Sequence, residues 1–182
     1  FTMKGIEYTI PRNYLYQMDD WAGGEQRVGV SIRVVYPGLK PYSKETESCM
    51  SRKIRCRVYD IYVTTADFSS ERNSNNLINI PGIYKKTKPG PYGFTLIEVG
   101  PKDARWDLYR KVVDGAQIIF DCQPYDIDGK SGAICHHFSH AKSGIAISYF
   151  FERNDGLRDA VEVDDSIRRL IDGFVNTGAV KL

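Results

Sequence analysis

Alternation of apolar and polar positions runs through most of this chain and predicts a β-rich protein. The clearest example is residues 27–36, where every second side chain is an aliphatic one that would face inward: Val28, Val30, Ile32 and Val34. Similar patterns bounded by turn residues predict further strands over 4–10, 53–65, 92–99, 108–113, 116–122, a stretch beginning at Cys135, and 145–151. In 53–65 the assignment of faces changes near Asp60, so we expect a bulge there.

One segment near the C-terminus has helical periodicity instead. Its apolar residues follow the i, i+3, i+4 and i+7 spacing of an amphipathic helix: Ile167, Leu170, Ile171 and Phe174. We expect Asp164 or Asp165 to cap its first turn. The pattern as a whole predicts an α+β protein, an antiparallel sheet with one long C-terminal helix packed on a face, in a single domain over residues 1–182.

Two stretches interrupt the alternation and predict loops. Residues 19–24 read Asp-Asp-Trp-Ala-Gly-Gly, an exposed loop with one large aromatic side chain. Residues 66–90 are polar and rich in Ser, Asn, Lys, Pro and Gly, and we expect a long excursion there with a short helix around 69–77. Long loops in compact domains tend to carry function or to move.

Composition narrows the function classes. The 182 residues are 42% hydrophobic and 26% charged, with a net charge of +2, which is too mild to indicate nucleic-acid binding. No window reaches the roughly 18 consecutive apolar residues of a membrane span. The chain begins at Phe1 without Met, which we interpret as a removed leader, leaving room for a lipoprotein anchor upstream, or as a cloning boundary.

The four cysteines indicate an oxidising compartment. They fall in two local pairs, Cys49 with Cys56 and Cys122 with Cys135. Four cysteines allow three pairings, and we expect the local one because each pair flanks a predicted turn. The alternative is a cytosolic protein with four buried thiols. Under the local pairing, the sheet is stapled by two disulfides and the protein lies outside the cytoplasm.

Catalytic and metal motifs are weak. The three imidazoles His136, His137 and His140 are spaced H-H-x-x-H, which differs from the H-E-x-x-H of zinc hydrolases. Gly129-Lys130-Ser131 lacks the earlier glycine and the following helix of a phosphate-binding loop. We therefore predict no catalytic residue, no metal ligand, no cofactor and no enzymatic activity.

Three features together resemble small periplasmic immunity proteins and lipoproteins encoded beside type VI secretion effectors: residues 8–15, residues 30–37, and the C-x(12)-C ending followed by a strand and a helix. The resemblance implies that the protein binds a cognate toxin in the periplasm and blocks its active site. It further implies a phospholipase as the toxin.

An inhibitor of this kind needs projecting anchors on a rigid scaffold. We expect these anchors in two loops, with the following residues: Asp19, Asp20, Trp21, Tyr84, Lys85, Lys86, Lys88 and Tyr92. The alternative is a periplasmic module that binds a small ligand or an envelope component on the face of its sheet.

Overall fold

The computed structural model describes residues 1–16, 28–66, 76–101, 105–127 and 130–175. The chain forms two compact units. Unit 1 contains Phe1–Asp67, Ser139–Tyr149 and Val163–Leu182, and unit 2 contains Phe68–Phe138 and Phe150–Glu162. Within the described residues, no helix is long and apolar enough to cross a membrane.

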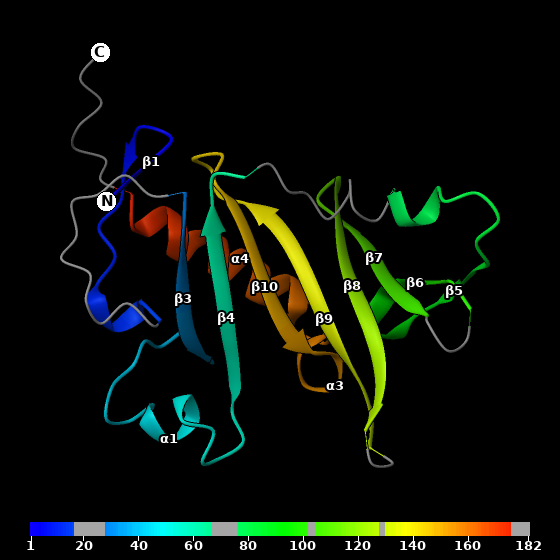
Figure 1. Cartoon of the computed structure of the whole chain (residues 1–182), viewed down its shortest axis with the longest axis horizontal. Helices are drawn as coiled ribbons and strands as arrows, with labels where there is room; N and C mark the ends of the chain where they lie inside the picture. The colour runs from blue at the N-terminus through cyan, green and yellow to red at the C-terminus, as the bar shows by residue number, and fades with distance from the viewer. Residues whose placement is uncertain (17–27, 67–75, 102–104, 128–129, 176–182) are drawn as a thin grey trace. The chain divides into compact units, whose positions relative to one another are not determined.

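An eight-stranded sheet in the order β3-β4-β10-β9-β8-β7-β6-β5 confirms the predicted fold class (Figure 1). Its strands are β3 (Gly29–Tyr36), β4 (Arg57–Thr64), β5 (Lys85–Pro89), β6 (Thr95–Val99), β7 (Trp106–Val113), β8 (Ala116–Ile127), β9 (Lys130–His140) and β10 (Ala146–Glu152). The strand pairs with a defined register are all antiparallel. Most connections between neighbours in the chain are therefore hairpins, as the short turn signals in the sequence indicate.

Unit 1 is built on the β3–β4 pair. Every second side chain of each strand is buried, and these side chains form the sheet's contribution to the core: Val30, Ile32, Val34, Tyr59, Ile61 and Val63. The register runs without interruption from Gly29 opposite Thr64 to Tyr36 opposite Arg57. The predicted bulge near Asp60 is therefore wrong, because simple alternation already places the buried hydrophobic residues of β4 on one face.

Two short strands replace the predicted strand over residues 4–10. These are β1 (Thr2–Met3) and β2 (Ile6–Glu7), which pair antiparallel. Lys4 and Gly5 between them have φ of 48° and 75°, the left-handed geometry of a tight hairpin turn. The segment continues through η1 (Arg12–Tyr14), a single turn of 3-10 helix.

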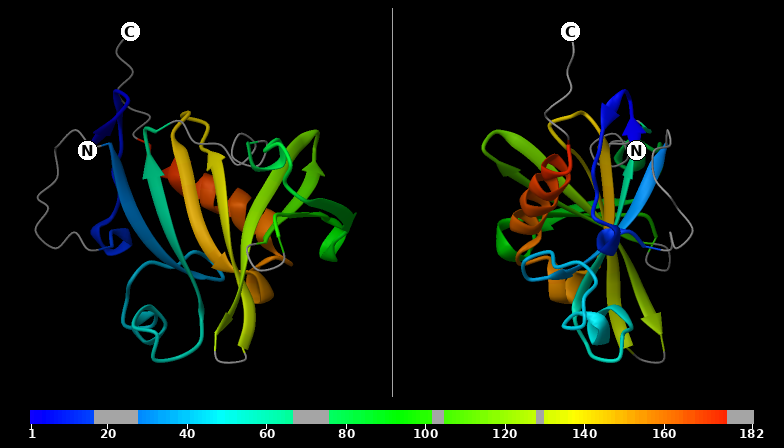
Figure 2. Two further views of the ribbon diagram at one scale, coloured as in Figure 1. Left: turned by 45° about the vertical axis from the view of Figure 1, so that its right-hand side comes forward. Right: turned by 90° about the vertical axis from the view of Figure 1, so that its left-hand side faces the viewer.

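Helix α4 (Ala160–Gly173) covers one face of the unit 1 strands and is preceded by the short α3 (Arg153–Gly156) (Figure 2). Val163, Ile167 and Ile171 of α4 are fully buried, as the predicted periodicity requires. The helix begins several residues before the expected cap, so the prediction that Asp164 or Asp165 caps it is wrong. Asp164 is instead buried and accepts hydrogen bonds from Tyr149 Oη at 3.4 Å and Arg168 Nε at 3.0 Å.

Unit 2 contains β5–β8 and most of β9. Asp114 and Gly115, between the predicted strands 108–113 and 116–122, form the turn that joins β7 to β8, with φ of 50° and 78°. Strand β5 was not predicted, because Lys-Lys-Thr-Lys-Pro is polar throughout and all five residues are exposed at the end of the sheet order. The helix expected around 69–77 falls mostly outside the described residues, although residues 76–78 are helical.

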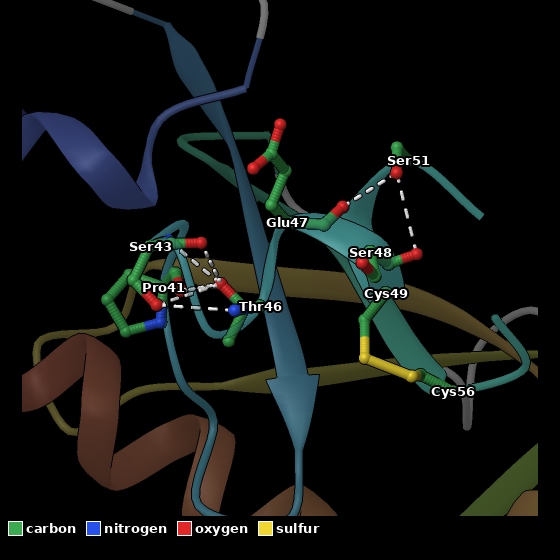
Figure 3. Close-up of a disulfide and its surroundings, with 8 residues drawn as sticks. All are labelled: Pro41, Ser43, Thr46, Glu47, Ser48, Cys49, Ser51 and Cys56. Atoms are coloured by element: carbon green, nitrogen blue, oxygen red, sulfur yellow. Dashed lines mark hydrogen bonds between the residues drawn. A yellow bond between two sulfur atoms is a disulfide. The ribbon is translucent and has the colours of Figure 1, made fainter. Parts of the chain in front are cut away.

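Both predicted disulfides are present. Cys122 and Cys135 are fully buried and directly opposed in the β8–β9 register. Cys49 lies on the short helix α1 (Glu47–Met50) and bonds to Cys56, seven residues later (Figure 3). The turn into α1 is held by Thr46, whose hydroxyl donates to the Pro41 carbonyl at 2.8 Å and accepts from the Ser43 amide at 2.8 Å.

Candidate partner-binding surface

The first group of predicted anchors, Asp19, Asp20 and Trp21, lies outside the described residues. The second group begins with Tyr84, directly before β5, and continues on β5 and on η2 (Pro91–Gly93), so the three lysines project from a strand rather than from a loop. Tyr84 is 60% exposed and Tyr92 is 48% exposed. A strand paired along its length holds its side chains more rigidly than a loop does.

The alternation of β5 divides its three lysines between two faces. Lys85 pairs with buried Val99, while Lys86 pairs with Glu98 in the β5–β6 register. Lys88, two residues after Lys86, shares the Glu98 face. The structure therefore separates Lys85 from Lys86 and Lys88, which the sequence had grouped together.

Glu98 is the first of two carboxylates that organise this face. The Lys88 ammonium lies 2.8 Å from Glu98 Oε1, and Arg105 Nη1 lies 3.1 Å from the same oxygen. The hydrogen bond from Lys88 lowers the pKa of Glu98, which outweighs the opposing effect of burial. Glu98 is thus held as an anion between two cations.

Asp107, on the neighbouring strand β7, is the second carboxylate. Its side chain is only 1% exposed, with Arg105 Nε 2.8 Å from one oxygen and Arg153 Nη1 3.3 Å from the other. Arg153 also donates to the Tyr109 hydroxyl at 3.3 Å. Burial raises the pKa of Asp107 and the two guanidinium groups oppose that rise. The network ties α3, which contains Arg153, to β7.

A third group of contacts surrounds Tyr92. The Lys111 ammonium donates to the Tyr92 carbonyl at 3.1 Å and lies 5.3 Å from the centroid of the Phe94 ring. The Arg158 guanidinium lies 5.6 Å from the centroid of the Tyr92 ring. Both distances are within the range of cation–π attraction.

We define the basic surface by seven residues of unit 2: Lys86, Lys88, Tyr92, Arg105, Lys111, Arg153 and Arg158. Lys86, Lys88, Arg105 and Arg153 lie around the two carboxylates, and Lys111 and Arg158 lie around Tyr92. Six cations and two carboxylates leave positive charge in excess among these residues. The sequence predicted Lys86, Lys88 and Tyr92 but missed Arg105, Lys111, Arg153 and Arg158, which are far apart in the chain. The only local signal was the alternation of β7, which places Lys111 on the same face as Asp107 and Tyr109.

The histidines have structural surroundings. His137 is buried, with Nδ1 2.6 Å from the Ile119 carbonyl and its ring 4.5 Å from the ring of Phe120. His136, the preceding residue, is on the opposite face of β9. Among the residues that the structure describes, no group of three or more His, Cys, Asp or Glu side chains is arranged to hold a metal ion.

His136 is the centre of an aromatic patch on this opposite face. Its ring stacks on Phe150 at 4.1 Å and lies 4.1 Å from the ring of Phe138. Asp121 lies 3.9 Å away, opposite it in the register. Burial lowers the pKa of His136 to about 4 and raises the pKa of Asp121 to about 6. Burial thus disfavours the charged form of both side chains.

No family model matches this sequence, and no curated protein matches it. Two solved structures share its fold. The immunity protein Smlt3025 of the Stenotrophomonas maltophilia type IV secretion system has a TM-score of 0.65 and 17% identity, covering 97% of this chain and 92% of its own. The Neisseria meningitidis iron-regulated outer membrane lipoprotein FrpD has a TM-score of 0.63 and 18% identity, covering 97% and 91%. Identities this low establish the fold alone.

Proposed function

We propose that this protein is an immunity protein, which binds a toxin delivered by a bacterial secretion system and blocks it. The observation that carries the proposal is the basic surface. Lys86, Lys88 and Lys111 lie on paired strands, and two carboxylates hold Lys88, Arg105 and Arg153. A preorganised surface loses little entropy on binding. The shared fold with Smlt3025, itself an immunity protein of a secretion system, supports the same role.

The location that fits this role is the periplasm or the envelope. Two disulfides require an oxidising compartment to form and persist. We propose a periplasmic protein, either unanchored or attached to a lipid upstream of Phe1. We further propose that it has no catalytic activity of its own and acts by covering the toxin's active site.

The finer form of the proposal names the toxin. We propose a type VI secretion effector with phospholipase activity, the partner implied by the motifs at residues 8–15 and at the C-terminus. The shared fold with a type IV immunity protein supports the immunity role at the coarser level.

The test is direct binding and inhibition. The purified product of the adjacent effector gene is titrated with this protein by calorimetry, and its hydrolysis of phospholipid vesicles is followed. We expect a one-to-one complex, an interface of about 1,600 Å², and loss of hydrolysis at equimolar protein. No binding at micromolar concentration would overturn the immunity role and favour the small-ligand or envelope-binding module. Binding to a toxin that leaves phospholipids intact would overturn only the phospholipase assignment.

The segment at residues 19–24, a loop by the sequence prediction, is tested in the same assay. Trp21→Ala is expected to weaken binding about thirtyfold, the effect of losing an anchor worth about 2 kcal/mol. Equal binding by the variant and the wild type would remove this loop from the interface and leave the immunity role standing.

A further inference from the structure

We infer that the basic surface is the docking site for an acidic polypeptide segment of the partner. The inference rests on the proposed function and adds the chemistry of the contact. It follows from how the cations of this surface are distributed around its carboxylates.

The two carboxylates engage only part of the available cationic surface. Glu98 contacts Lys88 and Arg105, and Asp107 contacts Arg105 and Arg153. The interactions described for Lys111 and Arg158 are with a carbonyl and aromatic rings rather than with carboxylates. Lys111 and Arg158 can therefore bind carboxylates of another chain without breaking an ion pair described here.

The paired cations remain accessible as well. The side chains of Lys88, Arg105 and Arg153 are 42%, 35% and 28% exposed, while Asp107 beneath them is 1% exposed. A guanidinium has five N–H donors and can engage a second carboxylate while keeping the first. The buried anions thus fix the positions of the cations, and the exposed faces of the cations point to a ligand of opposite charge.

The composition of the surface favours a protein ligand over a lipid or nucleic-acid one. Half-exposed Tyr92 lies against Arg158, and Tyr and Arg are the residues most enriched at the centres of protein interfaces. The net charge of the whole chain is only +2, so its long-range field is weak. Attraction to an acidic segment would therefore arise from contacts at this surface.

A hexaglutamate peptide tests the inference without the toxin. The full chain, labelled with ¹⁵N, is titrated with hexaglutamate, and amide shifts are mapped. We expect shifts concentrated at Lys88, Tyr92, Lys111, Arg153 and Arg158, with binding that weakens as salt is added. Shifts spread evenly over lysines and arginines of both units would overturn the inference.

Charge reversal supplies the matched control. The double variant Lys111→Glu with Arg158→Glu is expected to lose about tenfold in hexaglutamate affinity, because two attractions become repulsions. Lys85→Glu reverses a charge on the same sheet-edge strand but on its other face, so it should bind within about twofold of wild type. Equal losses in both would show nonspecific attraction. Lys86→Glu provides a second single-site reversal if the double variant fails to fold.

Toxin binding by the wild type and by the double variant separates this inference from the proposed function. If the wild-type chain binds the toxin and the double variant binds equally well, the basic surface is not the contact and the immunity role survives. If hexaglutamate maps to the basic surface but no toxin binds, the immunity role fails and the acidic-segment site survives. Tighter binding to vesicles of anionic phospholipid than to hexaglutamate would overturn the inference in favour of a membrane surface.

Discussion

Two groups of ion pairs on the sheet strands, one in each compact unit, are arranged differently. In unit 1, Arg33 of β3 faces Asp60 of β4, with Nε 2.5 Å and Nη2 2.8 Å from the two carboxylate oxygens. One cation meets one anion, and their charges cancel. In unit 2, Asp107 contacts the guanidinium groups of both Arg105 and Arg153. Glu98 also contacts the guanidinium group of Arg105. The comparison suggests that one-to-one pairing supports a strand pair, whereas an excess of cations around buried anions produces a surface suited to a charged ligand.

The disulfides differ in a parallel way. Cys122–Cys135 of unit 2 lies between two paired strands and is fully buried, with thirteen residues of sequence separation. Cys49–Cys56 of unit 1 closes a separation of seven residues beside the short helix α1, and both cysteines are half-buried. The first therefore contributes to the core and to chain entropy, and the second mainly to chain entropy.

The largest expected effect comes from removing the buried disulfide. Cys122→Ala with Cys135→Ala should lower the free energy of unfolding by about 3 to 4 kcal/mol, from the lost cross-link and the lost packing. Cys49→Ala with Cys56→Ala should cost about 2 kcal/mol, because its loop is shorter. Urea denaturation measures both. A larger loss for the Cys49 and Cys56 variant would show that the unit 1 disulfide stabilises the protein more than the buried one does.

Next in size is the loss of one buried anion. Asp107→Asn should lower the free energy of unfolding by about 2 to 3 kcal/mol, because Arg153 loses the carboxylate it contacts and Arg105 keeps only Glu98. Asp60→Asn in unit 1 should cost less than about 1 kcal/mol, since Asp60 is 46% exposed. Thermal and urea unfolding are compared for the two variants. Equal losses would mean that the two ion-pair arrangements do not differ energetically.

A pH series tests a third effect, in which burial disfavours the ionised forms of Asp121 and His136. The folded pKa of Asp121 is raised from 3.8 to about 6, so its contribution to stability falls as pH rises through that window. The folded pKa of His136 is lowered from 6.5 to about 4, so its contribution rises over nearly the same window. The two trends oppose each other, and the wild type should show little net change from this pair.

Single variants expose each trend. Relative to wild type, the stability of Asp121→Asn should rise by about 2 kcal/mol between pH 4 and pH 6.5, and that of His136→Gln should fall by a similar amount. Parallel pH curves for the wild type and the two variants would contradict the opposed titration of Asp121 and His136.

The smallest expected effect comes from replacing one arginine of each ion-pair group with lysine. Arg33→Lys should cost about 1 kcal/mol, because it loses the two-point contact with Asp60 and the stacking of the guanidinium on Tyr16 at 3.5 Å. Arg153→Lys should cost less, since Arg105 still contacts Asp107. Denaturant midpoints resolve the difference. A greater loss for Arg153→Lys would identify the link from α3 to β7 as the stronger restraint.

Much of the fold followed from local pattern. Alternation predicted β3, and the turn Asp114-Gly115 was evident from residue type, because few residues adopt left-handed φ easily. The helical periodicity identified α4 but placed its start too late. The stretch at 160–166 also contains acidic residues that resemble a cap, and only the packing of Val163 shows that the helix has already begun.

By itself, the sequence predicted most of the antiparallel strands, the terminal helix and the local cysteine pairing that the structure shows, because each depends on residues close together in the chain. Only the tertiary structure decided that β5 is a strand, since a polar edge strand has no apolar alternation and needs β6 to pair with. The same is true of the basic surface. Lys88, Arg105 and Arg153 come from β5, the segment before β7 and α3, and they meet because Glu98 and Asp107 are adjacent in the β6–β7 register. Long-range register depends on the pairing of the whole sheet, which no local pattern specifies.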